Sequence, residues 1–432
     1  MKINRLKVAG LFGLYNYDIS FSHDGDNFTV LTSPNGYGKT TLLRVINSLD
    51  PKRLYYLYTL KFKELNIWFD DNTMLVVNEP EMEENDNAIS DTQRDYRRGL
   101  LFVWMTGNRE ICRFEYRPAD IRSAMALIKR RDLVIRHIGD EYVGENKEYF
   151  FGGELGEKLN SELAQMNGQE QFFLQLAMVQ TDFIGANRIY MPSRKERGSK
   201  FRMETPIQQV VAELQQMLLK TVNDFQNNFQ RLDSKFIDML LNDEGMEISE
   251  QEYNVKATAL FDKIKELASL GLTNRQTLPA FNHKNAKVLD VYLTLMAEKL
   301  RFYDDLLPLI QLFSKNVKQK HFADKSIRLS PQHGLRIESD NGDILDPDLL
   351  STGEQNQIVL LYDLIFKTPY GSILLIDEPE SSLHVAWQND FVDDMQLIAK
   401  MKGLQIVVAT HSPIIVSNTP DDQVFDLYYL QK

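Results

Sequence analysis

The sequence of 432 residues contains one cysteine, Cys112, which excludes an internal disulfide and a zinc site built from cysteines. One cysteine also suits a reducing compartment, so we expect the protein in the cytoplasm. No apolar run approaches the roughly 20 residues that a membrane-spanning helix needs. Residues 1–14 show neither the long apolar core nor the cleavage site of a signal peptide. We therefore expect no membrane contact.

Basic residues are in the minority, because 49 Lys and Arg face 61 Asp and Glu and give a net charge of −12. This balance argues against a protein that coats nucleic acid over its whole surface, but it allows a local basic patch. Two basic clusters exist, and each is read either as solvated surface or as a site for nucleic acid or an acidic protein. They are Lys129, Arg130, Arg131, Arg136 and His137, and Arg194, Lys195, Arg197, Lys200 and Arg202.

The pattern of apolar residues predicts an α/β fold with an inserted helical region. Short apolar runs predict strands before residue 33, antiparallel hairpins over 58–118, and strands again at "KSIRLS" and "GLRIES". A short strand is predicted at "NRIYMPS", and residues 204–241 predict a helix of roughly 55 Å at 1.5 Å per residue. We expect four parts: residues 1–120 and 321–432 as two halves of one α/β unit, 121–203 as a linking region, and 204–320 as a helical insertion.

The stretch "SPNGYGKTTLL", from Ser33 to Leu43, lies between a predicted strand and a predicted helix. Successive backbone N–H groups in such a loop surround phosphate oxygens, and its glycines permit close approach. The lysine would reach the β- and γ-phosphates and the following threonine would bind Mg²⁺. Ser33 replaces the usual first glycine, but the residues nearest the phosphates are intact. The predicted ATP-binding residues here are Asn35, Gly36, Gly38, Lys39, Thr40 and Thr41, with Thr40 also a metal ligand.

Two further motifs supply the chemistry of nucleotide hydrolysis. The apolar run "SILLIDEPE" predicts a central parallel strand that ends in Asp377 and Glu378. Asp377 suits Mg²⁺ bound through water, and Glu378 suits the base that orients the attacking water. Further on, "VVATHSP" places His411 at the end of another apolar run, one helix and one strand later. We predict that His411 contacts the γ-phosphate.

The stretch "LLSTGEQNQIVLL" predicts a helix that begins near Ser351 with a capping residue and a nearby acid. Gly353 in the first turn is unexpected, because glycine destabilises a helix. A helix N-terminus whose glycine admits close approach is typical of an anion site, most often for phosphate.

Taken in order, these motifs resemble the ABC-class ATPases, specifically the soluble branch with RecF, SMC proteins and OLD-family ATPases. The resemblance covers about residues 1–120 and 320–432. It implies an ABC-type P-loop ATPase head, with a mixed sheet and an antiparallel β subdomain and with an inserted helical hairpin or bundle. "LSTGEQ" is similar to the signature motif and "EPESSLH" to the D-loop. The resemblance further implies that Ser351 and Gly353 bind ATP in trans, within an ATP-sandwich dimer or a higher homo-oligomer.

Two sites stay open. A Q-loop is expected between the P-loop and the signature, and Asn187 and Arg188 are weak candidates, with edge-strand packing as the alternative. Tyr15 and Tyr17 are candidates for stacking on adenine, although aromatic strand residues are more often part of a core.

Three function classes are compatible with such an ATPase. A repair or chromosome-maintenance ATPase is implied by the RecF and SMC resemblance, and it remains the alternative. An OLD-type nuclease needs a nuclease domain after the ATPase. We do not expect such a domain here, because only about 20 residues of the sequence follow His411. A regulatory ATPase that controls a separately encoded effector fits best. The layout is most similar to the AriA-type ATPase subunits of PARIS-type anti-phage systems, which implies a TOPRIM-like nuclease as effector and a phage-encoded trigger.

Overall fold

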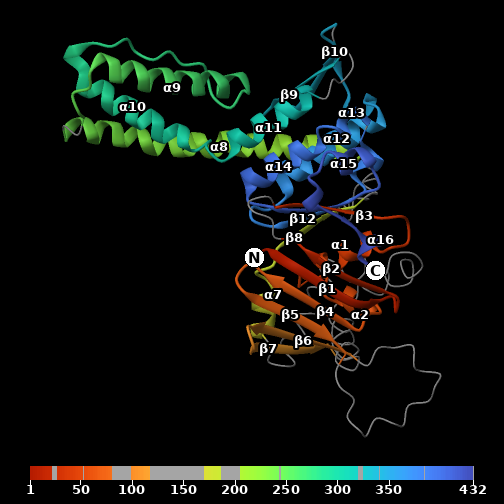
Figure 1. Ribbon diagram of the computed structural model, residues 1–432. Coiled ribbons are helices and arrows are strands. Elements are labelled where there is room, and N and C mark those ends of the chain that lie inside the picture. Colours follow the sequence, from red (N-terminus) through yellow and green to blue (C-terminus); the bar gives the residue numbers. More distant parts are fainter. Residues whose placement is uncertain are drawn as a thin grey trace, which may run out of the picture. The chain divides into compact units, whose positions relative to one another are not determined.

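The computed structural model describes residues 1–21, 27–51, 53–79, 99–116, 170–185, 205–242, 245–319, 325–339, 341–383 and 385–431. The chain divides into two compact units, which are Met1–Ala186 with Thr368–Lys432, and Asn187–Lys367. Both units combine helices and strands (Figure 1). The predicted α/β fold with parallel and antiparallel sheets and inserted helices is therefore confirmed.

The first unit contains a six-stranded sheet in which every neighbouring pair is antiparallel. Along most strands buried and exposed side chains alternate, as expected for a sheet with one face on the core. In sheet order the strands are β2 (Tyr15–Ser20), β1 (Ile3–Leu11), β4 (Glu64–Phe69), β5 (Thr73–Asn78), β6 (Leu100–Thr106) and β7 (Arg109–Tyr116). The two hairpins predicted over residues 58–118 are β4–β5 and β6–β7.

A second sheet of five parallel strands completes this unit. Its central strands are buried along their whole length, which matches their unbroken apolar sequences. In sheet order the strands are β14 (Val424–Asp426), β3 (Phe28–Thr32), β13 (Gln405–Ala409), β12 (Ile373–Asp377) and β8 (Thr181–Ile184). The strand predicted at 187–193 lies outside the described residues, and β8 ends just before it.

The register brings the carboxyl ends of the parallel strands to one edge. Asp377 pairs with Ala409, and Ala409 pairs with Leu31. On the other side of β3, Thr32 pairs with Asp426. Groups that follow these strands are therefore neighbours, although they are up to about 390 residues apart in the sequence. This edge is where open parallel sheets place their ligand sites.

A side-chain amide joins the two sheets of the first unit. Gln405, which is buried at the start of β13, accepts a hydrogen bond from the backbone N of Ile3 (2.8 Å) and donates one to the oxygen of the same residue (2.7 Å). Helix α1 (Lys39–Asn47) packs against β8, β12 and β13, and α14 (Phe391–Lys402) packs against β3 and β13. One apolar core includes residues of both sheets and of α1.

The second unit is built on a long helix, α8 (Pro206–Leu241), which confirms the helix predicted at 204–241. Thr205 caps its N-terminus and Pro206 occupies the first turn, where proline is well tolerated. Helix α10 packs on both α8 and α9 (Figure 1). The remaining elements are α9 (Glu250–Ser269), η2 (His283–Asn285), α10 (Ala286–Arg301), α11 (Leu306–Gln319), β9 (Lys325–Ser330), β10 (Gly334–Ser339), β11 (Ile344–Leu345), η3 (Pro347–Leu349), α12 (Thr352–Tyr362) and a π-helix, η4 (Asp363–Lys367).

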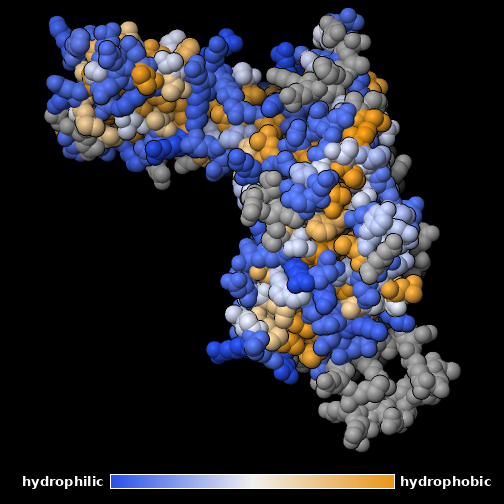
Figure 2. Space-filling view, viewed as in Figure 1, coloured by the Kyte–Doolittle hydropathy of each residue, from blue (hydrophilic) through white to orange (hydrophobic). Residues whose placement is uncertain are grey.

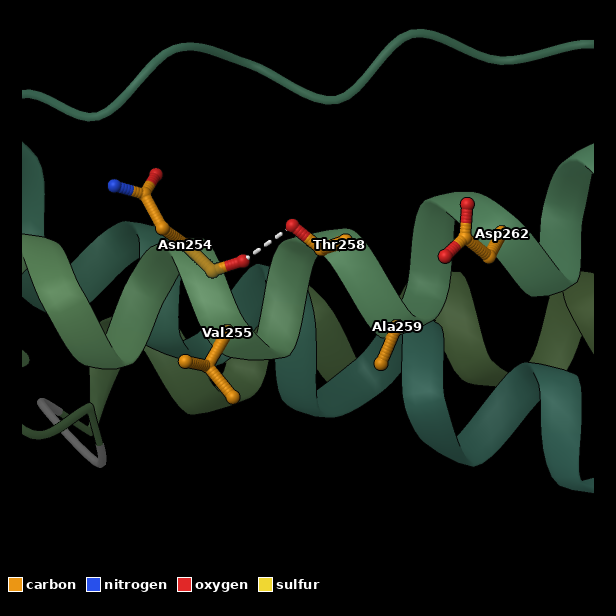
Figure 3. A pocket seen from close by; sticks show the side chains of 5 residues that line it. All are labelled: Asn254, Val255, Thr258, Ala259 and Asp262. Atoms are coloured by element: carbon orange, nitrogen blue, oxygen red, sulfur yellow. Dashed lines mark hydrogen bonds between the residues drawn. The ribbon is translucent and has the colours of Figure 1, made fainter.

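The helices of the second unit expose apolar side chains among polar ones (Figure 2). Leu241, Met246 and Val255 are 80%, 71% and 73% exposed. A shallow pocket of about 560 Å³ lies on α9, and all its lining residues come from that helix (Figure 3). They are Asn254, Val255, Thr258, Ala259 and Asp262, and they include no basic group that would hold a phosphate. Within the described ranges, no helix is both long and apolar enough to cross a membrane.

Candidate functional site

The loop between β3 and α1 has the backbone shape that its glycines permit. Gly36 and Gly38 have φ values of 90° and 83°, in the left-handed region that side chains with a Cβ avoid. Gly38 is also the residue that precedes α1, and it has no side chain to cap the first N–H groups of that helix. The loop therefore presents backbone donors and a helix N-terminus to the same space, as an anion site requires.

Lys39 is 7% exposed, and its ammonium is held inside the loop. Its Nζ donates hydrogen bonds to the carbonyl oxygen of Ser33 (2.8 Å) and to the Ser33 hydroxyl (3.3 Å). Burial lowers the pKa of Lys39, while nearby carboxylates, Glu378 first among them, act in the opposite direction. Ser33, which replaces a glycine of the usual motif, thus contacts the lysine directly.

Thr40 and Asp377 meet at the edge of the parallel sheet. The Thr40 hydroxyl donates to Oδ1 of Asp377 at 3.0 Å. Burial raises the pKa of Asp377, and the hydrogen bond from Thr40 partly offsets this rise. A hydroxyl beside one carboxylate fits Mg²⁺, which is usually held by few protein groups together with waters and phosphates. The described residues contain no group of three His, Cys, Asp or Glu side chains that would hold a metal ion alone.

Glu378, the predicted base, has a left-handed backbone with φ 45° and ψ 59°. This conformation is strained for a residue with a Cβ and costs on the order of 1–3 kcal/mol. The surroundings hold it in place, because its N–H donates to the oxygen of Ala409 (2.8 Å) and its own oxygen accepts from the Ser381 hydroxyl (2.8 Å). Such strain is typical of functional positions.

His411 lies just beyond β13, with an exposed side chain. Its backbone N–H donates to Oε1 of Glu380 at 2.6 Å, and the hydroxyl of the buried Thr410 donates to Oε2 at 2.7 Å. The segments after β12 and β13 are therefore joined by one carboxylate. Neither Glu380 nor Thr410 was predicted from the sequence, although the third acid in "DEPE" is a pattern that could have indicated a further site residue.

Asp426 is a second acid that the sequence analysis missed. It ends β14, beside the strand that leads into the P-loop. Burial lowers the pKa of Lys39, and the charge of Asp426 is among those that oppose this lowering. Its carboxylate also accepts from the backbone N of Tyr428 (2.9 Å), at the start of α16 (Leu427–Leu430). The position of an acid at the end of the last predicted strand could have indicated Asp426 as a site residue.

The two tyrosines that were candidates for adenine contact differ in their surroundings. Tyr17 is 1% exposed, and its hydroxyl donates to the backbone oxygen of Tyr37 in the P-loop (2.6 Å). Burial raises the pKa of this hydroxyl to about 12. Tyr15 is only partly buried, and its ring contacts both Tyr17 and Tyr37. Tyr17 is thus a core residue that supports the loop, and only Tyr15 retains an accessible ring.

Ser351 and Gly353 belong to the second unit, at the N-terminus of α12. Ser351 and Glu354 form the capping box that the sequence predicts. Oε2 of Glu354 accepts from the Ser351 backbone N (2.7 Å) and hydroxyl (2.8 Å), and Lys325 pairs with the same carboxylate (2.9 Å to Oε1). Gly353 is exposed, and a Cβ added to it would meet nothing within 4 Å.

The structure thus brings most of the predicted site together in the first unit. Asn35 to Thr41, Asp377, Glu378 and His411 all follow strands that end at one edge of the parallel sheet. Asn187, Arg188, His384 of the D-loop and both basic clusters lie outside the described residues.

Solved structures of Smc heads are similar to this chain at low identity. The Smc head bound to the C-winged helix domain of ScpA is 14% identical, with a TM-score of 0.36 over 99% of this chain and 97% of that one. The Smc head with an extended coiled coil bound to the C-terminal domain of ScpA, from Pyrococcus furiosus, is 13% identical, with a TM-score of 0.36 over 97% and 92%. The SMC head domain from Thermotoga maritima is 11% identical, with a TM-score of 0.32 over 97% and 92%.

No curated protein matches the sequence. A family described as AAA ATPase domain matches residues 1–416, which is nearly the whole chain. That match agrees with a glycine-shaped loop, a buried lysine and a threonine–aspartate pair at the edge of a parallel sheet. The chain belongs to the AAA ATPase domain family.

Proposed function

We propose that the protein binds ATP and Mg²⁺ at the P-loop and hydrolyses the phosphoanhydride bond between the β- and γ-phosphates. The observation that carries this proposal is the contact between Thr40 and Asp377 (3.0 Å) beside the buried ammonium of Lys39. A fold gains little from burying a lysine and a carboxylate whose pKa values are both displaced toward the neutral form. A site that takes up phosphate and a divalent cation accounts for both groups.

Each residue has a defined part in this proposal. Lys39 donates to the phosphate oxygens, and the loop N–H groups from Asn35 to Thr41 surround them. Thr40 and Asp377 hold Mg²⁺, which supplies charge neutralisation on the phosphates when bound. Glu378 orients the attacking water and accepts its proton, and His411 donates a hydrogen bond to the γ-phosphate.

Ser351 and Gly353 complete the site of a second copy in this proposal. Support comes from α12 itself, whose exposed first turn carries a glycine that its own chain does not require. A helix N-terminus with an open approach is suited to the phosphate of another subunit. ATP then joins two copies, as a dimer or within a larger homo-oligomer.

In the cell, the assembled ATPase acts as the sensor and regulatory scaffold of an anti-phage system in the cytoplasm. It controls a separately encoded effector, a TOPRIM-like nuclease, and responds to a phage-encoded trigger. Support comes from the second unit, whose helices expose large apolar side chains where a protein partner could bind. The negative net charge does not favour nucleic acid as the main partner.

The ATPase proposal is tested first with Lys39→Ala. Loss of a charge-assisted contact should weaken ATP binding about 10- to 100-fold, measured with a fluorescent ATP analogue, and should abolish turnover. Lys400→Ala, which removes an exposed lysine of α14, is the matched control and should behave like the wild type. A Lys39→Ala protein that binds and hydrolyses ATP normally would refute the site.

The cellular role is tested by pull-down of the wild-type protein with the products of neighbouring genes. Recovery of a nuclease whose activity depends on ATP and on Glu378 supports the regulatory role. A DNA-stimulated ATPase that recovers no such partner would replace it with a RecF- or SMC-like function in DNA repair or maintenance.

A further inference from the structure

Glu380 is an acid at the site for which neither metal binding nor base catalysis accounts. It lies in the 3₁₀-helix η5 (Pro379–Ser382), directly after the strand end that carries Asp377 and Glu378. Both of its carboxylate oxygens point to donors of another segment, since Oε2 accepts from the Thr410 hydroxyl (2.7 Å) and Oε1 from the His411 N–H (2.6 Å). Both distances are short, as expected for bonds to a charged acceptor.

The hydroxyl of Thr410 is a link in a longer chain of hydrogen bonds. It accepts from the Ser412 N–H (2.9 Å) while it donates to Glu380. Ser412 in turn caps α15 (Pro413–Ser417) and donates its own hydroxyl to Gln388 (2.6 Å). Thr410 is fully buried and Ser412 is 4% exposed, so these groups have little alternative to their present partners.

We propose that Glu380 is a positioning residue for His411. The Thr410 N–H is already fixed by the oxygen of Leu31 at the end of β3 (3.1 Å). With the two bonds to Glu380, the peptide before His411 is held to β3 on one side and to the segment after β12 on the other. Among the described residues, the imidazole of His411 has no hydrogen bond or ion pair, so its position is set by its backbone.

A carboxylate satisfies this arrangement without any rearrangement of its partners. Both partners of Glu380 are donors, and an ionised carboxylate is the side-chain group that only accepts. A glutamine of the same size would lose the negative charge, and its NH₂ group would face the Thr410 hydroxyl, which would have to turn its hydrogen away from its present acceptor. The segment after β12, which carries Glu378, and the segment after β13, which carries His411, would then be held to each other less tightly.

This inference rests on the proposed ATPase function, because His411 matters only if it contacts phosphate. Small displacements of a group that acts in the transition state have large kinetic effects, and a shift of about 1 Å can reduce turnover about 100-fold. Burial lowers the pKa of Lys39, and the negative charge of Glu380 opposes this lowering. Removing that charge should leave ATP binding unchanged or tighten it, while positioning is lost.

The experiment compares three variants of the full-length chain. Glu380→Gln should lower kcat about 10- to 100-fold, with ATP binding unchanged or tighter. Thr410→Val removes the hydroxyl but keeps the shape and the charge of Glu380, and it should lower kcat in the same direction. Thr410→Ser retains the hydroxyl and should recover most of the lost turnover. Asp393→Asn, an exposed acid of α14, is the control for charge removal.

A purely structural role would predict a different pattern, in which Glu380→Gln loses ATP binding and thermal stability together with kcat. The proposal is overturned by that pattern, or by a Glu380→Gln protein with wild-type kcat. A Thr410→Ser protein as slow as Thr410→Val would also overturn it, because the hydroxyl would then not be the relevant group.

Amide hydrogen exchange of residues 409–413 provides a test without hydrolysis. Glu380→Gln should raise exchange at His411, because a neutral amide oxygen is a weaker acceptor for its N–H than the carboxylate, while α14 keeps its protection. If the wild type does not hydrolyse ATP, the proposed function fails while this exchange result still decides whether Glu380 fixes the segment. Unchanged exchange at His411 would overturn the positioning role.

Discussion

Two regions of this molecule contain glycines that the sequence predicts to lie near phosphate, and the backbone conformation of these glycines differs between the two regions. In the P-loop, Gly36 and Gly38 adopt φ values of 90° and 83°. In α12, Gly353 has ordinary helical geometry, and a Cβ added there would meet no atom within 4 Å. The fold of the chain itself requires glycine in the first region and does not require it in the second.

This difference supports the proposal that one site is formed within a single chain and that the other needs a partner. The P-loop glycines allow the backbone to turn around the phosphate space. Lys39 is already hydrogen-bonded to the loop, and Thr40 is hydrogen-bonded to Asp377. At α12, the capping box satisfies Ser351 without any ligand. Glycine in the first turn of a helix costs about 0.5–1 kcal/mol relative to alanine, so an approach from outside the chain is the physical reason we assign to Gly353.

The largest expected effect comes from Glu378→Gln, which acts only in the first region. Glutamine keeps the size of the side chain but cannot accept the proton, so turnover should fall about 100-fold or more. ATP should still bind, and it should persist. If ATP joins two copies through α12, size-exclusion chromatography with ATP should show a more stable assembly than the wild type forms.

Glu378→Gln therefore links the two regions in one measurement. Adding Gly353→Asp to it should remove the assembly without restoring turnover. Unchanged turnover in Glu378→Gln would move the base to another residue, and a slow but monomeric variant with bound ATP would count against assembly through α12.

Gly353→Asp tests the second region alone. A carboxylate beside the γ-phosphate of a second copy would oppose closure by like-charge repulsion in a partly desolvated site. ATP binding to the variant's own P-loop should be normal, while ATP-dependent assembly and turnover should fall about 10-fold or more. A monomeric Gly353→Asp protein that hydrolyses ATP at the wild-type rate would show that one chain is sufficient.

Mixing Gly353→Asp with Lys39→Ala sharpens this test. In a closed dimer with two sites, a mixed pair has one site with both defects and one site with neither. Some hydrolysis should therefore return on mixing when the subunits exchange and one intact site suffices. Native mass spectrometry of the mixture checks that mixed pairs form, which gives the kinetic result its meaning.

The strands and helices that carry the candidate site could be predicted because each motif has a local physical cause. Unbroken apolar runs indicated β12, with Asp377 and Glu378 at its end, and β13, with His411 shortly after it. The capping box at Ser351 was also predictable, since it depends on residues three apart. The antiparallel hairpins followed from period-two alternation and polar turns.

What could not be predicted depends on contacts between distant segments. The pairing of Glu380 with Thr410 and His411 joins residues about 30 apart, and no pattern in either stretch reports it. Asp426 and Thr40 are brought to one edge only by the strand order. In the second unit, α12 packs against α8, and Lys367 of the following π-helix η4 pairs with Glu213 of α8 (3.0 Å).

The smallest expected effect, and the most direct comparison of the two regions, comes from the same change made in each. Gly38→Ala forces a Cβ into a left-handed conformation, which costs about 1–2 kcal/mol. ATP affinity should fall about 5- to 30-fold, because only the strained loop binds phosphate.

Gly353→Ala should instead raise the free energy of unfolding by up to about 1 kcal/mol, because alanine favours the helix and restricts the unfolded chain. Its own ATP affinity should equal that of the wild type, while ATP-dependent assembly weakens because the added methyl group lies where a partner's phosphate must approach. Titration with a fluorescent ATP analogue, urea unfolding and size-exclusion chromatography measure these three quantities separately. A Gly353→Ala protein that is more stable and also assembles and turns over normally would mean that the glycine serves no close approach, and the assignment of α12 to a shared site would fall.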